Sequence, residues 1–332
     1  MSKQITLADI ARACNTSNVT VSKALADKKG VSDELRKKIK ETARSMGYVP
    51  PRTTPVRKDN NMVGVLIPAK FMDPNGSFYW ALYNSLVNRL MKTGHYSLIC
   101  NLSEEDENDL VLPKFITDGK VCSVISLGQL SRKYVETLRD TSLPLLLLDY
   151  YYAGSGVDSV VTNGYMGGYE LTTHLISRGH RKIGFIGTVM STSSIFDRYM
   201  GYRKAMLEYG IEVKPEWTLD DRDEHTNTDI IFPEELPTAF VCNCDEAAYK
   251  AINQLEAIGR HVPDDVSVVG YDNYLISEIS KPPITTINVD SDYMAGKAVE
   301  TLLSRIYSPD SPARTITISG DLIIKESVRT LS

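Results

Sequence analysis

Three carboxylates stand at positions where a protein can hold a ligand. Asp149 follows the apolar run PLLLL, Asp245 follows TAFVCNC, and Asp272 follows VSVVGY. Arg198 opens a helical pattern after another apolar run, KIGFIGT. Carboxylates accept hydrogen bonds from hydroxyl groups, and a guanidinium donates them to oxygen atoms. We therefore predict a site for a small hydroxyl-bearing molecule. The alternative is that each Asp caps a helix or forms a structural ion pair.

Three aromatic residues, Phe78, Tyr79 and Trp80, begin the first helical pattern after the run MVGVLIP. Aromatic rings stack on the apolar faces of ligands. We expect Phe78 and Tyr79 to contact the ligand, whereas core packing is the better interpretation of Trp80.

A second kind of chemistry is concentrated near the N-terminus, in the segment SNVTVSK. Asn can bridge adenine, Lys can reach guanine, and Val can pack on the methyl group of thymine. Hydroxyl groups suit phosphate oxygens, which position a protein on DNA without reading its sequence. The predicted DNA contacts are Thr6, Leu7, Ser17, Asn18, Val19, Thr20, Ser22, Lys23, Arg52 and Arg57.

Three short helical patterns can position these residues. The first has apolar side chains at i, i+3, i+4 and i+7 from Leu7, and the second covers 17–26. The third begins at the N-cap residue Ser32 and ends at Gly47. Between the first two, Asn15 suits the left-handed conformation of a tight turn. Together they predict a helix-turn-helix, whose second helix enters the major groove of DNA.

Charge is distributed unevenly along the 332 residues. Residues 1–58 contain 13 basic and 5 acidic side chains, a net charge of +8. The remainder contains 24 basic and 37 acidic side chains, so the overall charge is −5. This asymmetry indicates a polyanion-binding module joined to a domain of another kind. It favours DNA binding over a small helical bundle with a solvated charged face.

From Met62 onward, short apolar runs alternate with helical patterns, which is typical of α/β domains with parallel sheets. About 270 residues are too many for one typical core, so we expect two similar lobes with a ligand cleft between them. The predicted strands are MVGVLIP, YSLIC, VCSVIS, PLLLLD, DSVVT, KIGFIG, TAFVC and VSVVG. The predicted helices cover 79–93, 132–141, 165–178, 197–209 and 246–258.

Enzymatic chemistry is not indicated. The glycines of GYMGGYE follow a strand but do not form a GxGxxG or P-loop pattern. The five histidines are scattered, and the pair Cys242-Asn-Cys244 has no second pair with metal-ligand spacing. We therefore predict no enzymatic activity, no metal and no cofactor.

Membrane association is not indicated either. No apolar run approaches the ~18–20 residues that cross a bilayer. The first residues, MSKQITLADIARAC, lack the apolar stretch and cleavage site of a signal peptide. We expect a cytoplasmic protein.

The run ITLADIARACNTSNVTVSKALADKKGVSDELRKKIKETARSMGYVP resembles the N-terminal domain of the LacI/GalR family of bacterial transcription regulators. TVSKAL, GVSDELRKKI and GYVP match that family's pattern. The sequence departs from it at Asn15-Thr16, where Gly-Val is usual, and at Lys23, where Arg is commoner. Lys lacks the bidentate fork of Arg, so we expect weaker or different base discrimination there.

Residues 51–61, PRTTPVRKDNN, have the composition of a linker. The resemblance implies a hinge helix here that inserts a Leu into the minor groove when two chains pair on DNA. This segment contains no Leu, and Pro55 would break such a helix. Arg52 and Arg57 can enter a narrow minor groove instead.

The remaining sequence resembles the same family and, more broadly, the type I periplasmic sugar-binding fold. GHRKIGFIGT, RYMGY, LPTAFVCNCDEAA, VPDDVSVVGYDN, PPITTINVD and LIIKES carry this resemblance. It implies that Asp149, Arg198 and Asp272 contact a small effector, often a sugar. It also implies that Phe78 and Tyr79 form an aromatic wall.

The resemblance also implies chain crossings near Thr162, Val289 and Gly320. We expect a DNA-binding domain over 1–50, a linker over 51–61, and an effector-binding and dimerisation domain over 62–332. Its N-lobe would comprise about 62–161 and 290–319, and its C-lobe about 162–289 and 320–332. Both lobes are expected to be Rossmann-like.

Two departures affect the expected effector. Cys244 stands where Asn is usual in this family, and 211–237 is about ten residues shorter than usual. TNTDIIFPEE cannot hold the helix normally found in that segment, because Pro233 and β-branched residues oppose it. The effector therefore need not be a common sugar, and the sequence leaves sugar, sugar phosphate and nucleobase open.

These observations predict a transcriptional regulator, and a repressor, that binds a near-palindromic operator as a homodimer and responds to a small molecule, a sugar being the favoured class. The alternative is a transport-type sugar-binding receptor without a regulatory role. That alternative predicts a secretory signal and no basic head, and the sequence shows the opposite pattern.

Overall fold

The structure of the protein is a computed structural model that describes residues 7–25, 30–46, 60–72, 78–223 and 228–331. The chain divides into two compact units, one up to Thr54 and one from Pro55 onward. We call the first unit the head and the second the body.

The head consists of three helices: α1 (Leu7–Ala13), α2 (Asn18–Leu25) and α3 (Asp33–Ser45). Its core is formed by Ile10, Ala11, Cys14, Val21, Ala24, Ile39 and Ala43. Asn15 has a φ of 51°, so the turn between α1 and α2 has the predicted left-handed residue. Ser32 caps α3 through its side chain, as predicted. These features confirm the three-helix arrangement expected from the sequence.

The body contains two six-stranded sheets, which confirms the predicted α/β architecture. The N-lobe sheet has the order β11-β5-β4-β3-β1-β2, and all its strands are parallel. Its strands are β1 (Met62–Pro68), β2 (Tyr96–Leu102), β3 (Ser123–Leu127), β4 (Leu145–Leu148), β5 (Asp158–Thr162) and β11 (Thr315–Ile318).

The C-lobe sheet has the corresponding order β12-β10-β9-β8-β6-β7. Its strands are β6 (Ile183–Ile186), β7 (Thr218–Leu219), β8 (Ala239–Cys242), β9 (Ser267–Asp272), β10 (Thr285–Asn288) and β12 (Asp321–Ile323). Five of them are parallel, whereas β12 is antiparallel to β10. The antiparallel edge strand is a departure from the all-parallel expectation. β12 enters the C-lobe directly after β11 of the N-lobe, whereas β10 runs toward the passage back to the N-lobe through Val289, so the two strands point in opposite directions.

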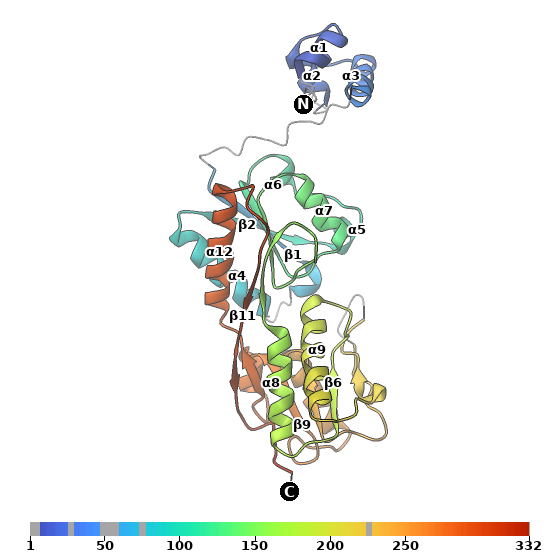
Figure 1. Ribbon diagram of the computed structural model, residues 1–332, viewed down its shortest axis with the longest axis vertical. Coiled ribbons are helices and arrows are strands. Elements are labelled where there is room, and N and C mark those ends of the chain that lie inside the picture. The colour runs from blue at the N-terminus through green and yellow to red at the C-terminus, as the bar shows by residue number, and fades with distance from the viewer. Residues whose placement is uncertain (1–6, 26–29, 47–59, 73–77, 224–227, 332) are drawn as a thin grey trace. The chain divides into compact units, whose positions relative to one another are not determined.

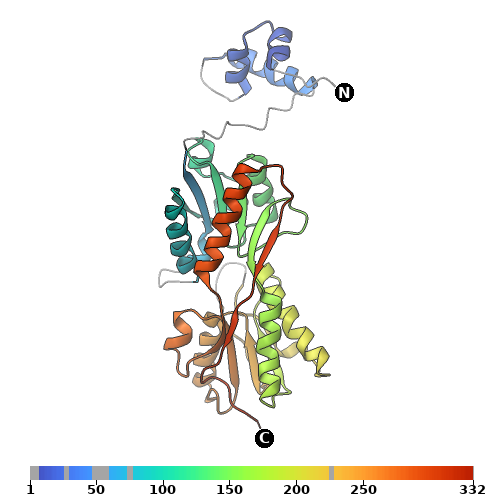
Figure 2. The same ribbon diagram turned by 60° about the vertical axis from the view of Figure 1, so that its left-hand side comes forward.

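Helices cover both faces of each sheet, so the hydrophobic strands are buried (Figure 1). In the N-lobe, α4 (Phe78–Lys92) packs beside α12 (Ser291–Tyr307), as Figure 2 shows. In the C-lobe, α8 (Gly164–Ser177) packs beside α9 (Ser193–Glu208). The other helices are α5 (Glu104–Asn108), α6 (Lys114–Thr117), α7 (Arg132–Asp140), α10 (Asp245–Ala257), α11 (Leu275–Ile279), and the 3-10 turns η1 (Ala69–Phe71) and η2 (Pro215–Trp217).

The chain passes between the two sheets three times. It leaves the N-lobe after β5, which ends at Thr162, and enters α8 of the C-lobe. It returns between β10 and α12, through Val289, and passes back between β11 and β12, through Gly320. Both lobes are therefore built from segments that are distant in the sequence.

One helix, α9, differs from its predicted bounds in a way that matters for the site. α9 begins at Ser193, four residues before the predicted start, because Thr192 caps it by accepting from the backbone N–H of Ile195. Arg198 therefore lies in the second turn of α9 and does not open the helix. Residues 228–237 contain no helix, as the composition of that segment predicted.

Candidate functional site

The body contains a cavity of about 930 Å³ between elements of its two sheets. Residues from η1, α4, α9, α10, α11 and the end of β9 line it, together with Asp149 directly after β4 and Asn243 directly after β8. The six predicted ligand residues all lie on its wall: Phe78, Tyr79, Asp149, Arg198, Asp245 and Asp272. The structure thus brings together side chains that are up to 194 positions apart in the sequence.

The carboxyl ends of the strands place the acidic residues. Asp149 follows β4 directly and Asp272 ends β9. Both have positive φ values, 69° and 111°, which are uncommon for residues other than glycine. A strained backbone at a strand end is often associated with a functional site.

Tyr79 and Asp149 form a buried pair on the N-lobe side. The Tyr79 hydroxyl donates to Asp149 Oδ2 at 2.9 Å. Burial raises the pKa of Asp149, although the charge of Arg198 and the Tyr79 hydrogen bond oppose the rise. Asp149 Oδ1 is buried and has no partner among the described residues. A buried polar atom without a partner is costly, so this oxygen is suited to accept a ligand hydrogen.

Arg198 lies on the C-lobe side and is only 5% exposed. Its guanidinium lies 3.8 Å from the ring centroid of Tyr271. Nη1 donates to the carbonyl oxygen of Asn243 at 2.5 Å, and Nη2 reaches Asp272 Oδ1 at 3.5 Å. Nε has no partner in the described part of the chain. Arg198 is therefore held in place and retains a donor for a ligand oxygen.

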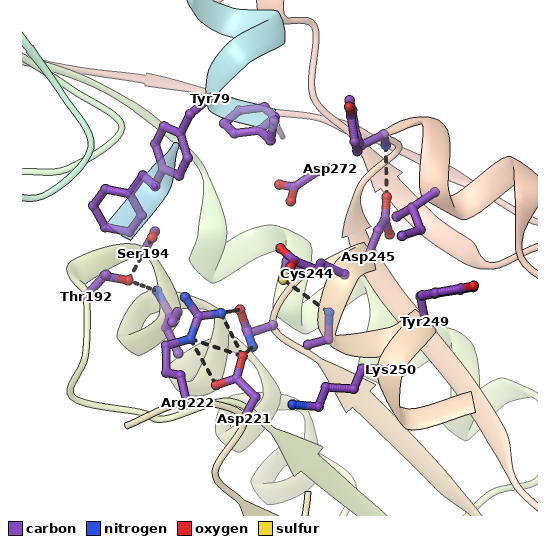
Figure 3. Close-up of a pocket in the computed structure, with 18 of the residues that line it drawn as sticks. Tyr79, Thr192, Ser194, Asp221, Arg222, Cys244, Asp245, Tyr249, Lys250 and Asp272 are labelled. Carbon is purple, nitrogen blue, oxygen red and sulfur yellow. Dashed lines mark hydrogen bonds and ion pairs between the residues drawn. The ribbon is translucent and has the colours of Figure 1, made fainter. Parts of the chain in front are cut away.

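Asp272 faces the cavity in Figure 3 and has a pKa well above the usual range. Burial is the main cause, the attraction of Arg198 opposes it, and the charges of Asp245 and Asp149 add to it. Too few positive charges lie near these carboxylates to keep all of them ionised without cost.

Asp245 is more completely engaged by the protein than Asp149. Its Oδ1 accepts from the Thr286 hydroxyl at 2.6 Å, and its Oδ2 accepts from the backbone N–H of Tyr274 at 2.9 Å. Burial raises its pKa to about 7 despite these hydrogen bonds. Cys244, at the preceding position, caps α10 through its sulfur atom. Asp245 thus joins α10, β10 and α11 at the cavity wall.

Aromatic rings form one wall, as expected. The ring centroids of Phe71 and Tyr79 are 4.7 Å apart, and those of Phe78 and Tyr79 are 5.6 Å apart. The interpretation of Trp80 as a core residue is wrong, because its side chain is on the outer side of α4 and is 43% exposed. It stacks on Tyr83, 5.5 Å away.

Sequence reasoning missed a second arginine on the cavity wall. Arg222 donates from Nε to both oxygens of Asp221 at 3.1 Å, and from Nη2 to Oδ2 at 2.6 Å (Figure 3). Asp221 is 3% exposed and also accepts from Thr188 N and Asn243 Nδ2, at 2.9 and 2.7 Å. β7, which precedes this pair, is only two residues long, so no apolar run marked the strand end.

Of the predicted DNA contacts in the described part of the chain, all but Leu7 lie in α2 or directly before it. Ser17 Oγ accepts from the backbone N–H of Thr20 at 3.1 Å, which makes Ser17 the cap of α2. Lys23 is exposed on the same helix. Leu7, Asn18, Val19 and Ser22 lie in α1 and α2, but their side chains are outside the described part. Thr6, Arg52 and Arg57 lie outside the described residues.

The described residues show neither a metal site nor a membrane-spanning helix. Among them, no group of three or more His, Cys, Asp or Glu side chains is arranged to hold a metal ion. None of their helices combines the length and the apolar composition that a membrane span requires.

Comparison with known protein families gives two matches along the chain. Residues 6–51 match the model described as bacterial regulatory proteins, lacI family. Residues 172–328 match the periplasmic binding protein-like domain. The first match covers the head, and the second covers most of the C-lobe and the return to the N-lobe.

Individual relatives extend over nearly the whole chain. The HTH-type transcriptional repressor PurR of Actinobacillus pleuropneumoniae is 28% identical, over 98% of this chain and 99% of its own length. The ribose operon repressor of Haemophilus influenzae is 29% identical, with the same coverage. A crystal structure of the lac repressor dimer bound to operator and the anti-inducer ONPF has a TM-score of 0.67 at 20% identity, covering 98% of this chain and 100% of that chain. The last likeness shows the fold.

Proposed function

Because the chain joins a lacI-family helix-turn-helix domain to a periplasmic-binding-protein-like domain, we propose that it is a transcriptional repressor controlled by a small molecule. The repressor names of its relatives support this function. The basic charge of residues 1–58 supports the attraction of the head to phosphates.

The DNA-bound form would be a homodimer. One helix-turn-helix reads only a few base pairs, so two heads related by a two-fold axis would read a near-palindromic operator. The dimeric, operator-bound lac repressor has the same fold, which supports this arrangement. We propose residues 1–50 as the DNA-binding domain, 51–61 as the linker, and 62–332 as the effector-binding and dimerisation domain.

The effector would occupy the cavity of the body. The single observation that carries this proposal is the presence of two unpartnered buried polar atoms on its wall, Asp149 Oδ1 and Arg198 Nε. One accepts and the other donates, which suits a polyhydroxylated molecule such as a sugar. The ribose operon repressor among the relatives supports a sugar as the class.

Control would come from movement of one lobe relative to the other. Gln129 accepts from the backbone N–H of Ser193 at 2.7 Å, and Tyr151 donates to Asp197 at 3.2 Å, so contacts already link the lobes. An effector can change DNA affinity only through its different affinities for the two lobe arrangements. We propose this role in the cytoplasm and without enzymatic activity. A transport receptor is disfavoured because it does not need the head.

Selection of bound duplexes from a random-sequence pool tests the DNA-binding half of the proposal. We expect near-palindromic sequences to be enriched, and their affinity to fall steeply with salt, by a logarithmic slope of about −0.9 per phosphate contacted. Lys23→Ala should weaken binding, whereas Lys92→Ala, an exposed site on α4, should not. Affinity independent of salt would contradict the proposal.

Release of the selected duplex by candidate effectors tests the other half. Arg198→Ala should abolish the response without changing DNA affinity in the absence of effector. Arg203→Ala is the matched control, because Arg203 is exposed on the same helix and does not line the cavity. A full response in Arg198→Ala would show that the effector binds elsewhere.

A further inference from the structure

Two guanidinium groups meet at one residue on the cavity wall. Arg198 Nη1 donates to the carbonyl oxygen of Asn243 at 2.5 Å, and Arg222 Nη2 donates to the side-chain Oδ1 of the same residue at 3.4 Å. Asn243 is 1% exposed, so it is a fixed point between them. Two guanidinium groups are thereby bound to one residue of the C-lobe wall, one to its backbone oxygen and one to its side chain.

Arg222 is held on one edge only. Its Nε and Nη2 atoms point at Asp221 and Asn243, while Nη1 has no acceptor among the described residues. Asp221 cannot rotate away, because Thr188 N and Asn243 Nδ2 also hold it. The side chain of Arg222 is 21% exposed and lines the cavity. Since the guanidinium is already fixed, binding a ligand there would cost little additional entropy.

Arg198 supplies a second free donor. Its Nε is buried and unpartnered, and its side chain is 7% exposed. Because a buried N–H without an acceptor is costly, this atom indicates a missing acceptor from outside the chain. The unfilled donors of two neighbouring arginines suit a group with several oxygen atoms better than a single hydroxyl.

The surroundings of Arg222 add donors. In Figure 3 the hydroxyls of Thr192 and Ser194 lie on the same side of the cavity as Arg222. Lys250 lies to the right of Asp221 in this view, and its Nζ already donates to the carbonyl oxygen of Thr228. Tyr79 and Asp272 lie on the opposite side in the same view. The cavity wall therefore combines the donors of Arg222, Thr192 and Ser194 with the carboxylates of Asp149 and Asp272.

The nearby carboxylates do not exclude an anion. Asp221 is committed to Arg222, and Asp272 lies 3.5 Å from Arg198. Burial raises the pKa of Asp149 and of Asp272, so an incoming negative charge can be accommodated by proton uptake at these groups.

We propose that the effector carries an anionic oxygen group, a carboxylate or a phosphate, which Arg222 and Arg198 bind, while its hydroxyl groups face Asp149. Arg222 is then the residue that selects a sugar acid or sugar phosphate over the neutral sugar. This inference rests on the proposed effector site and specifies its ligand class.

Calorimetric titration of the full chain with matched probes tests the proposal. The probes are glucose, glucuronate and glucose 6-phosphate; galactose, galacturonate and galactose 6-phosphate; ribose and ribose 5-phosphate; and inorganic phosphate alone. We expect at least one acid or phosphate to bind about tenfold or more tightly than its neutral parent, which corresponds to about 1.4 kcal/mol. The comparison of acid with phosphate identifies the group.

Variants connect the preference to Arg222. Arg222→Gln should remove the preference for the anion while the neutral parent binds as before, and Arg203→Gln should change neither. Arg222→Lys keeps the charge without the fork, so it should retain only part of the preference. If Arg222→Gln unfolds at a temperature well below that of the wild type, the test rests on Arg222→Lys. An unchanged preference of Arg222→Lys for the anionic probe over its neutral parent contradicts the proposal.

Other outcomes separate the two proposals. A neutral probe that binds as tightly as its anionic partner and releases the operator overturns the anionic class but leaves the repressor function intact. Binding of none of the probes at millimolar concentration also overturns it. Failure of the chain to bind DNA overturns the repressor function, whatever the probes show.

Discussion

Each lobe of the body contains a buried aspartate held by an arginine fork, but the two pairs are used differently. In the N-lobe, Arg305 donates from Nε and Nη2 to Asp158 at 2.8 and 3.0 Å. Its remaining N–H groups donate to the carbonyl oxygens of Pro309, Ser311 and Pro312. In the C-lobe, Arg222 leaves Nη1 without an acceptor among the described residues.

The position of each pair explains the difference. Asp158 begins β5, so its pair lies at the amino end of the N-lobe sheet and ties β5 to α12 and β11. Asp221 follows β7, at the carboxyl end of the C-lobe sheet, where the cavity lies. Ligands of open parallel sheets bind at the carboxyl ends of the strands. The Arg–Asp pair at the amino end of the N-lobe sheet thus stabilises the fold. The Arg–Asp pair at the carboxyl end of the C-lobe sheet leaves an N–H donor available to a ligand in the cavity.

The largest effect should come from removing the N-lobe carboxylate. Asp158→Ala leaves Arg305 partly buried without its counterion, and breaking such a pair costs about 3–5 kcal/mol. We expect chemical denaturation to show this loss, while the ligand affinity of the remaining folded protein is unchanged. Asp140→Ala, an exposed site in the same lobe, should change stability by less than about 0.5 kcal/mol.

Removing the carboxylate of the C-lobe pair should affect ligand binding more than stability. Asp221→Ala frees Arg222, whose side chain can turn toward the cavity, so the stability loss should be smaller than in Asp158→Ala. Calorimetry with the anionic probe should show weaker binding, because the guanidinium is no longer held in place. If Asp158→Ala also weakened binding, the division between structural and ligand-facing pairs would fail.

A second comparison between the lobes uses two glycines in corresponding strands. A Cβ at Gly64 of β1 would lie 2.5 Å from the ring of Phe115, whereas one at Gly184 of β6 would lie 2.6 Å from Phe240 and 2.7 Å from the backbone oxygen of Trp217. Phe115 is half-buried and can move, but Phe240 is fully buried. We expect Gly184→Ala to cost about 3 kcal/mol and Gly64→Ala about 1 kcal/mol in denaturant melts.

The pH dependence should reveal the unpaired charge at the cavity. Asp245 has a pKa of about 7, raised by burial and opposed by Lys325 and Arg198, with Asp272 close by. Since the unfolded carboxyl titrates near 4, stability from this group is present at low pH and is lost as the pH rises through 7. Between pH 6 and 8 the loss should be about 1.4 kcal/mol.

Asp245→Asn checks that assignment, since its amide can keep both hydrogen bonds through a rotation of the Thr286 hydroxyl. The variant should lose less stability than the wild type between pH 6 and 8. If the free energies of unfolding of the two proteins changed equally with pH, Asp245 would not titrate in this range.

The smallest effect should come from the N-lobe side of the cavity. Tyr79→Phe removes the donor to Asp149 Oδ2 but leaves the ring stacking intact, so we expect a stability loss of about 1 kcal/mol. Tyr83→Phe, whose hydroxyl meets Ser97 at 3.3 Å outside the cavity, is the matched control. Equal losses of stability in the two variants would show that the buried Tyr79–Asp149 hydrogen bond contributes no more to stability than the Tyr83–Ser97 contact.

The sequence predicted the strands that read as continuous apolar runs, because these are buried on both faces. β7, β10, β11 and β12 were missed. TITI in β11 alternates threonine with isoleucine, TTIN in β10 contains one apolar residue, and β7 and β12 are only two and three residues long, so none of them forms such a run. α12 was also not among the predicted helices. Three of the missed strands, β7, β11 and β12, are edges of the two sheets, so the overall order of the strands required the structure.

The site shows the same limit. Asp149 and Asp272 were found because each follows a long apolar run, and the strand-end rule then places them at the cavity. Arg222 lies close after a two-residue strand and is oriented by Asp221 and by Asn243, which lies 21 positions away directly after β8. No local pattern encodes that contact, because it depends on β7 and β8 pairing with the two sides of β6.

The three passages of the chain between the sheets also constrain how the protein is made. The N-lobe sheet is completed by β11, and α12 covers it, yet both are encoded after the whole parallel part of the C-lobe. During synthesis on a ribosome, β1 to β5 therefore emerge first and lack the edge strand β11 until the C-lobe has been synthesised. The exposed side of β5 is a template for wrong pairing during that interval. Folding of the N-lobe is thus a late event, reached only when nearly the entire chain has left the ribosome.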